Sequence, residues 1–246
     1  MLYKIVLILL LAVGLTACQF TESMVLNEDG SGTISMEMNF SEMMAISGEF
    51  DKDSTLVKMD TIVAFRDFLV EKKDSIASLS KAERARLKKL QNYKFRTVVD
   101  PETNEMLFDV FTNFSTVEEA NELMNAMENS GAFLQGTGDG VKVNNDEDSA
   151  GLIGVKYSFK RGKFVRDAYI RDKEKHNVQM DSIKQAEAFM SSVMYKLKYT
   201  FPKRIKKVSA KDASFSLDGK TVELERSMVE YMKDPDILDL QVELEN

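Results

Sequence analysis

The sequence predicts an α+β fold with a mainly antiparallel sheet that is built from hairpins, with amphipathic helices interspersed between them. Three observations predict this fold class. Stretches of alternating apolar and polar residues come in pairs joined by short turns that contain Gly, Asn or Asp, which is typical of β-hairpins. Stretches with the helical spacing of apolar residues stand between these pairs. Strands and helices do not alternate regularly, as they do in folds with a parallel sheet.

Four turns are predicted to close hairpins. The strand after the first turn shows the clearest alternation, because Ile34, Met36 and Met38 point one way and polar residues point the other. Another clear strand covers residues 195–201 and ends at Pro202, which cannot continue a ladder. The turns are residues 27–32, residues 100–104, Arg161-Gly162 and Asp218-Gly219, and further strands are residues 205–208 and 238–244.

Amphipathic helices are predicted between the hairpins. Ile62, Phe65 and Leu69 fall on one stripe of a helix over residues 60–79. Two Ser residues, each followed three positions later by Glu, have the spacing of a capping box and predict two further helix starts. These two begin at Ser80 and Ser115, and the others cover residues 42–46, 181–194 and 227–232. Residues 131–151 are rich in Gly, Asn and Asp and predict a flexible loop within a single domain over residues 24–246.

Composition excludes several classes of site. The 246 residues carry a net charge of -7, which argues against a general nucleic-acid binder. One Cys excludes an intrachain disulfide and a zinc site with several Cys ligands. One His excludes His-rich metal centres. We therefore expect no metal, no cofactor and no nucleic-acid partner.

The N-terminus has the pattern of a secretory signal. Lys4 supplies a positive charge, and the apolar run that follows it, residues 5–15, is too short to span a bilayer. It ends in Leu-Thr-Ala-Cys, which resembles the bacterial lipobox, in which the Cys is acylated after cleavage. The chain's single Cys, Cys18, stands at this position. We therefore predict a lipoprotein signal peptide over residues 1–17, lipidation of Cys18 and a lipidated tether over residues 18–23.

Gln19, which follows the Cys, bears on location. In the enterobacterial sorting rule, Asp at this position retains a lipoprotein in the inner membrane. Gln19 therefore favours the outer membrane in a Gram-negative cell. The alternative for the whole segment is a plain signal peptide in which the Cys falls here by chance.

Two segments carry a family resemblance. Residues 26–33, Leu-Asn-Glu-Asp-Gly-Ser-Gly-Thr, are similar to the first hairpin of many uncharacterised lipoproteins of Bacteroidota. Residues 199–205 and 216–222 more distantly resemble the end of the LppM-like lipoprotein family. The resemblance implies a cell-envelope lipoprotein with a membrane-tethered α+β domain that is lipid-associated and not enzymatic, and it offers no catalytic residues.

Other motifs have an ordinary structural interpretation beside a functional one. His176 lies in a charged stretch and is expected on the surface, because no nucleophile motif accompanies it. The acidic segment 144–148 lacks the glycine of a calcium loop and is expected to be solvated. The Met pairs 36/38 and 190/194 could bind copper(I) or line a pocket for an acyl chain, but Met is more often core filler.

Two basic segments stand out in this acidic chain. Residues 81–89 and 203–207 could rest against anionic lipid headgroups. We expect instead a solvated helix face and a strand edge protected by Lys.

The sequence therefore predicts a membrane-anchored envelope lipoprotein that acts as a non-enzymatic lipid- or protein-binding module. Its expected partners are the membrane, through acylated Cys18, and a lipid ligand or an envelope protein. The alternative is an envelope hydrolase that uses carboxylates or a metal held within residues 131–151.

Overall fold

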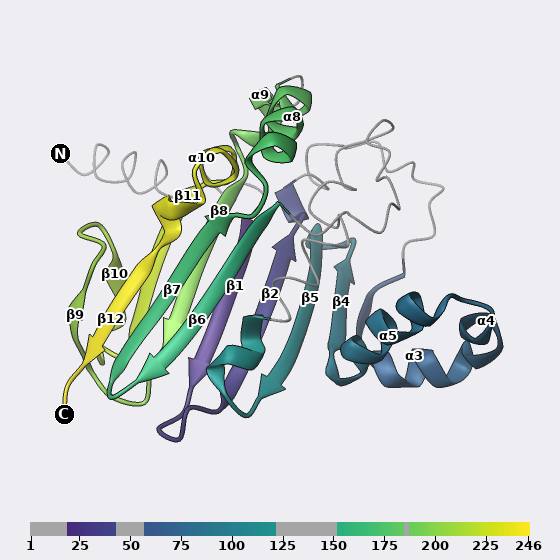
Figure 1. Ribbon diagram of the computed structural model, residues 1–246, viewed down its shortest axis with the longest axis horizontal. Helices are drawn as coiled ribbons and strands as arrows, with labels where there is room; N and C mark the ends of the chain where they lie inside the picture. The colour runs from purple at the N-terminus through teal and green to yellow at the C-terminus, as the bar shows by residue number, and fades with distance from the viewer. Residues whose placement is uncertain (1–18, 43–56, 122–151, 185–186) are drawn as a thin grey trace.

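The structure is a computed structural model, and it describes residues 19–42, 57–121, 152–184 and 187–246. Within this part, two sheets face each other, and buried side chains from both form one core cluster between them (Figure 1). All strand pairs but one are antiparallel. The predicted α+β class with a mainly antiparallel sheet is confirmed.

The large sheet has eight strands in the order β10-β11-β8-β1-β2-β5-β4-β3. β1 lies in its interior, antiparallel to β2 and parallel to β8, which is the one parallel pair. The strands are β1 (Gln19–Leu26), β2 (Gly32–Asn39), β3 (Met59–Ala64), β4 (Lys94–Asp100), β5 (Glu105–Phe114), β8 (Met194–Thr200), β10 (Ser214–Phe215) and β11 (Thr221–Ser227).

The small sheet has four strands in the order β6-β7-β12-β9. Its hairpin closes at the predicted Arg161-Gly162 turn, where both residues have positive φ. The strands are β6 (Ile153–Lys160), β7 (Lys163–Ile170), β9 (Ile205–Val208) and β12 (Leu240–Leu244).

The predicted tether differs from the structure over residues 19–23, which form the first part of β1. Phe20, Glu22, Met24 and Leu26 are all buried, so the strand has the strict alternation of a half-buried strand. The prediction was wrong because Glu22 occupies an inward position and hides that alternation. Residue 18 lies outside the described residues.

The helix predicted over residues 60–79 is also wrong in its first part. β3 occupies residues 59–64, and its Asp60 accepts two 2.8 Å hydrogen bonds from Arg96 of the neighbouring β4. The predicted helical structure is present only after residue 64, in α3 (Phe65–Glu71) and α4 (Lys73–Ala77). Pairing with β4 therefore overrides the helical spacing at the start of the segment.

The helix expected at residues 181–194 begins earlier, as α8 (Lys173–Ile183), because the Asp172 carboxylate accepts hydrogen bonds from the first backbone amides. The helix predicted at 227–232 is present with nearly the same ends. The other helices are α5 (Lys81–Lys89), η1 (Leu90–Asn92), η2 (Val117–Glu119), α9 (Glu187–Met190), α10 (Met228–Lys233) and η3 (Pro235–Leu238). The expected helix over 42–46 and the loop over 131–151 lie largely or wholly outside the described residues.

Candidate functional site

The most unusual feature of the core is a buried ion pair. Glu22 on β1 and Arg166 on β7 have no exposed side-chain surface. Arg166 Nη2 donates to Glu22 Oε2 at 3.0 Å, and Arg166 Nε donates to Oε1 at 3.3 Å. The remaining Arg166 Nη1 donates to the carbonyl of Leu238 at 3.1 Å. The pair thus joins the large sheet to the small sheet.

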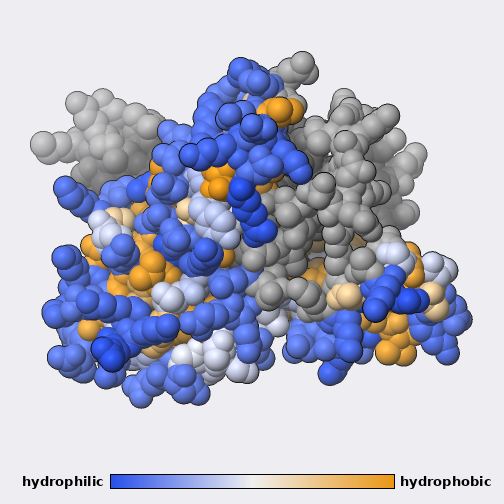
Figure 2. All heavy atoms as spheres, in the orientation of Figure 1, coloured by the Kyte–Doolittle hydropathy of each residue, from blue (hydrophilic) through white to orange (hydrophobic). Residues whose placement is uncertain are grey.

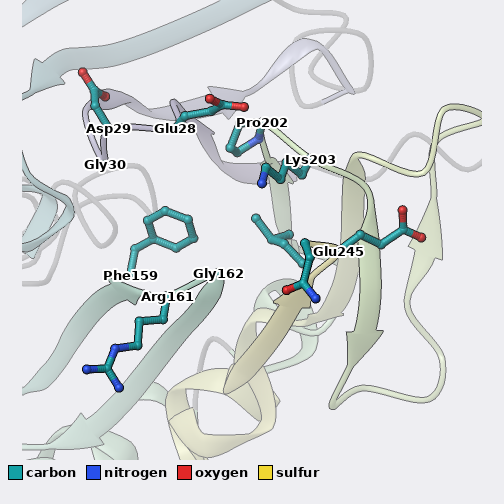
Figure 3. Close-up of a pocket in the computed structure, with 11 residues that line it drawn as sticks. Glu28, Asp29, Gly30, Phe159, Arg161, Gly162, Pro202, Lys203 and Glu245 are labelled. Atoms are coloured by element: carbon teal, nitrogen blue, oxygen red, sulfur yellow. The ribbon is translucent and has the colours of Figure 1, made fainter.

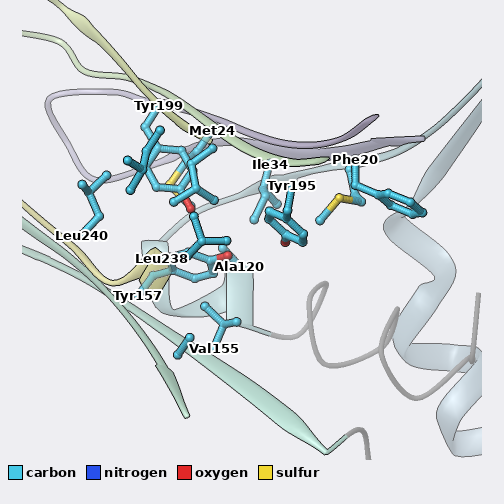
Figure 4. Packing of buried hydrophobic residues seen from close by; sticks show 14 of the residues in the cluster. Phe20, Met24, Ile34, Ala120, Val155, Tyr157, Tyr195, Tyr199, Leu238 and Leu240 are labelled. Carbon is cyan, nitrogen blue, oxygen red and sulfur yellow. The ribbon is translucent and has the colours of Figure 1, made fainter. Parts of the chain in front are cut away.

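Three tyrosine hydroxyls complete the shell of Glu22. Tyr195 of β8 donates to Oε2 at 2.8 Å, and Tyr157 of β6 and Tyr199 of β8 both donate to Oε1. These tyrosines lie between the two sheets among the buried apolar side chains (Figure 4). Every hydrogen-bonding position of the carboxylate therefore faces a donor, as a buried charge requires.

The environment fixes the charge of each member. Burial alone raises the pKa of Glu22, but the charge of Arg166 and the hydrogen bonds from Arg166, Tyr157 and Tyr199 bring it below the usual range. Burial, followed by the negative charge of Glu22, raises the pKa of all three tyrosines well above normal. Glu22 is therefore a carboxylate and the tyrosines are neutral donors. Since no member reaches solvent, the cluster fastens β1 in place and offers no site for a substrate.

A solvent-facing cavity lies at the end of the sheets where β1 ends. Its volume is about 460 Å³, which is within the range of small-ligand pockets. Three turns and the C-terminal end of β12 form it, and Phe159 lies between the Asp29-Gly30 turn and Arg161 (Figure 3). The lining residues are Glu28, Asp29, Gly30, Phe159, Arg161, Gly162, Pro202, Lys203, Leu244, Glu245 and Asn246.

The charged residues that line the cavity are of both signs. Within the described part of the chain, neither Arg161 nor Lys203 has a carboxylate within ion-pair distance. Asp29 is held by Ser31, which donates to it from its amide at 2.9 Å and from its hydroxyl at 2.7 Å. Arg161 has φ of 52°, a conformation that costs most residues energy. The cavity therefore presents two cations, carboxylates and one aromatic ring.

The other candidate residues predicted from the sequence do not come together in one site. His176 is buried rather than on the surface, and its Nε2 lies 2.6 Å from the Met232 carbonyl oxygen. The surface expectation was wrong because α8 packs this one side chain inward against α10. Met36 and Met190 lie in the core. Cys18, the acidic segment 144–148 and the loop 131–151 lie outside the described residues.

Two features are absent from the described residues. In residues 19–42, 57–121, 152–184 and 187–246, no three His, Cys, Asp or Glu side chains gather in a way that could hold a metal ion. In the same part of the chain, no helix combines the length and apolar character needed to cross a bilayer.

Comparison with known proteins gives a distant structural likeness. No family model matches the chain, and no curated protein sequence is significantly similar to it. Among solved structures, the chain is similar to the NMR structure of the folded domain of the Mycobacterium tuberculosis LppM protein. The TM-score is 0.41 at 7% identity, over 94% of this chain and 91% of that one. A likeness this distant identifies neither a family nor a ligand, and the resemblance to Bacteroidota lipoproteins stays a prediction.

The sequence did not point to Glu22 and Arg166. The one signal available was a charged residue at an inward position of an alternating segment, between Phe20 and Met24. Its partner lies 144 positions away, and nothing local marks it. The sequence pointed to Lys203 as part of the basic run 203–207, but as a strand edge protected by Lys rather than as part of a cavity.

Proposed function

We propose that this chain is a cell-envelope lipoprotein, anchored by acyl chains on Cys18, and that its α+β fold serves as a non-enzymatic binding module. One observation carries the proposal: the only Cys of the chain follows an apolar signal-like run and directly precedes β1. Cleavage before Cys18 would leave β1 whole. Gln19 favours the outer membrane of a Gram-negative cell as the location.

The cavity is the binding site that the geometry supports best. Phe159 supplies an apolar face, and Arg161 and Lys203 supply two positive charges. Glu28 and Glu245 line the same space. A ligand suited to it carries a negative group, an apolar part and a positive group, and both a zwitterionic lipid and a segment of an envelope protein meet that description.

The anchor is tested with the full chain in its bacterial host. Cys18→Ala should abolish incorporation of labelled palmitate and should either release the protein from the membrane fraction or leave it as uncleaved precursor. Thr16→Ser is the matched control, because it changes the same motif conservatively and keeps the Cys. Unchanged labelling and fractionation of Cys18→Ala would refute the anchor.

The binding role is tested by native mass spectrometry of the mature protein released from detergent. A bound species that appears only under native conditions, and is lost in Lys203→Ala, supports the cavity as a binding site. Its mass distinguishes a lipid from a peptide. Binding that survives both Lys203→Ala and Arg161→Ala would place the ligand elsewhere.

A further inference from the structure

We infer that the end of the molecule formed by α8, α9 and α10 lies against the lipid surface, and that the cavity faces away from it. This inference rests on the proposed acylation of Cys18. It follows because no flexible linker separates Cys18 from the large sheet. Gln19 is already paired with Asn39 of β2 and with Met194 of β8, so no free tether separates the anchor from the fold.

β1 cannot detach to provide slack. It lies between β2 and β8, so freeing its first residues breaks two ladders at once. Freeing it as far as Glu22 also breaks the buried pair with Arg166 and leaves an unpaired charge in the core. The first strand is therefore a rigid connection between the anchor and both sheets.

The helices at this end are identified by their connections. Met194, the partner of Gln19, follows α9, and it also pairs with Ser227, after which α10 begins. The amide of Met228 donates to the carbonyl of Val193 at 2.9 Å. α8 joins them through His176 and the Met232 carbonyl. Figure 1 shows α8, α9 and α10 together at one end of the strands.

The surface of this end suits lipid headgroups rather than the hydrocarbon interior. The atoms over α8 are mostly those of hydrophilic residues, with few apolar ones among them (Figure 2). We expect the acyl chains alone to enter the bilayer, while the three helices rest on the headgroups.

The opposite end is a strand length away. β1 runs from Gln19 to Leu26, which is about 23 Å at the usual rise per strand residue. The cavity lies at that far end, as does the β10–β11 turn with its fully exposed Leu217. The basic run that begins at Lys203 follows β8 at the same end, so it faces the aqueous phase and not the anchoring membrane.

Fluorescence quenching tests this orientation. Acylation blocks the thiol of Cys18, so one introduced Cys is the only free thiol of the mature chain. Val178→Cys on α8 and Leu217→Cys at the far turn are a matched pair, since the native side chains are 68% and 106% exposed. The acylated proteins are labelled and reconstituted in phosphatidylcholine–phosphatidylglycerol vesicles that contain a headgroup-linked quencher. We expect loss of fluorescence at position 178 and none at position 217.

A linker variant isolates the cause. A Gly/Ser segment of about 20 residues between Cys18 and Gln19 has a root-mean-square span of about 25 Å, which is comparable to the length of β1. It should remove the difference in fluorescence quenching between positions 178 and 217, while the protein still floats with the vesicles. Equal quenching at both positions in the native chain, or stronger quenching at 217, would overturn the orientation. Failure of the acylated chain to form or to float would overturn the proposed function instead.

Discussion

Glu22 and Arg166 form an ion pair that joins the strand next to the proposed anchor to the opposite sheet, and neither side chain has any exposed surface. Hydrogen bonds from Tyr157, Tyr195 and Tyr199 satisfy the rest of the carboxylate. A buried pair is weak evidence for added stability, because desolvation offsets much of the attraction. Removal of one partner is strongly destabilising, because the remaining charge stays buried without a counter-charge and without water.

Arg166→Met should therefore be strongly destabilising. It leaves the Glu22 carboxylate buried without its counter-charge, and loss of one partner of such a pair costs about 3–5 kcal/mol. The measurement is the free energy of unfolding in urea of the mature protein in detergent. The double variant Glu22→Gln/Arg166→Met is the control: its neutral amide still accepts hydrogen bonds from tyrosines, so it should be more stable than Arg166→Met. A double variant no more stable than the single one would show that the charge is not the cause.

Asp109 of β5 should make stability fall as pH rises. Burial, and then the facing carboxylate of Glu37, raise the pKa of Asp109 to about 6. Within the described residues its Oδ1 is buried without a hydrogen-bond partner, and Arg96 donates two hydrogen bonds to Asp60. In the unfolded chain an Asp carboxyl has a pKa of about 3.9. The folded form therefore holds its proton better, so this contribution to stability is complete below about pH 4 and lost as pH rises through about 6.

Asp109→Asn should accordingly raise the melting temperature at pH 8, and the gain should shrink at pH 5. Thermal unfolding at the two pH values measures this difference. Glu37→Gln should give a smaller gain of the same sign, because it removes only the second cause of the shift. A gain of equal size at both pH values would mean that packing, not charge, separates Asn from Asp.

Asp172 should contribute as the N-cap of α8. Its Oδ1 accepts from the amides of Glu174 and Lys175, each at 3.0 Å. Asp172→Ala removes both bonds and should lower the free energy of unfolding by about 0.5–2 kcal/mol, whereas Asp172→Asn keeps an acceptor and should cost much less. Hydrogen exchange of the α8 amides localises the effect. Equal losses in the two variants would argue against capping as the cause.

The fold could be predicted where local signals suffice. Alternation and turn residues locate all four hairpins, because a hairpin is fixed by neighbours in sequence. The prediction fails at β1, where Glu22 interrupts the apolar pattern, and at β3, where Ile62 and Phe65 have helical spacing although β4 holds the segment as a strand. In both segments, contacts with distant strands decide the structure.

The candidate sites depend on such contacts even more. The buried cluster brings together residues from β1, β6, β7 and β8, and no spacing in the sequence encodes that meeting. The cavity is formed by three turns and the C-terminal end of β12, and the sequence pattern does not show that these segments meet. The order of strands in the two sheets decides which of these distant segments meet, and the sequence pattern does not reveal that order.

Arg161 offers a test of whether the cavity is kept for binding. Its φ of 52° and that of Gly162, 71°, form a turn in which Asn-Gly is the favoured pair. Arg161→Asn should therefore raise the free energy of unfolding by about 1 kcal/mol, since Asn tolerates this conformation better. Asn104 is also a non-Gly residue with a positive φ, of 56°, so Asn104→Arg is the matched control and should lower the free energy of unfolding by a similar amount. If Arg161 serves the ligand, the stabilised variant should also lose the bound species in native mass spectrometry, whereas retention of that species would show that this strained arginine is not needed for binding.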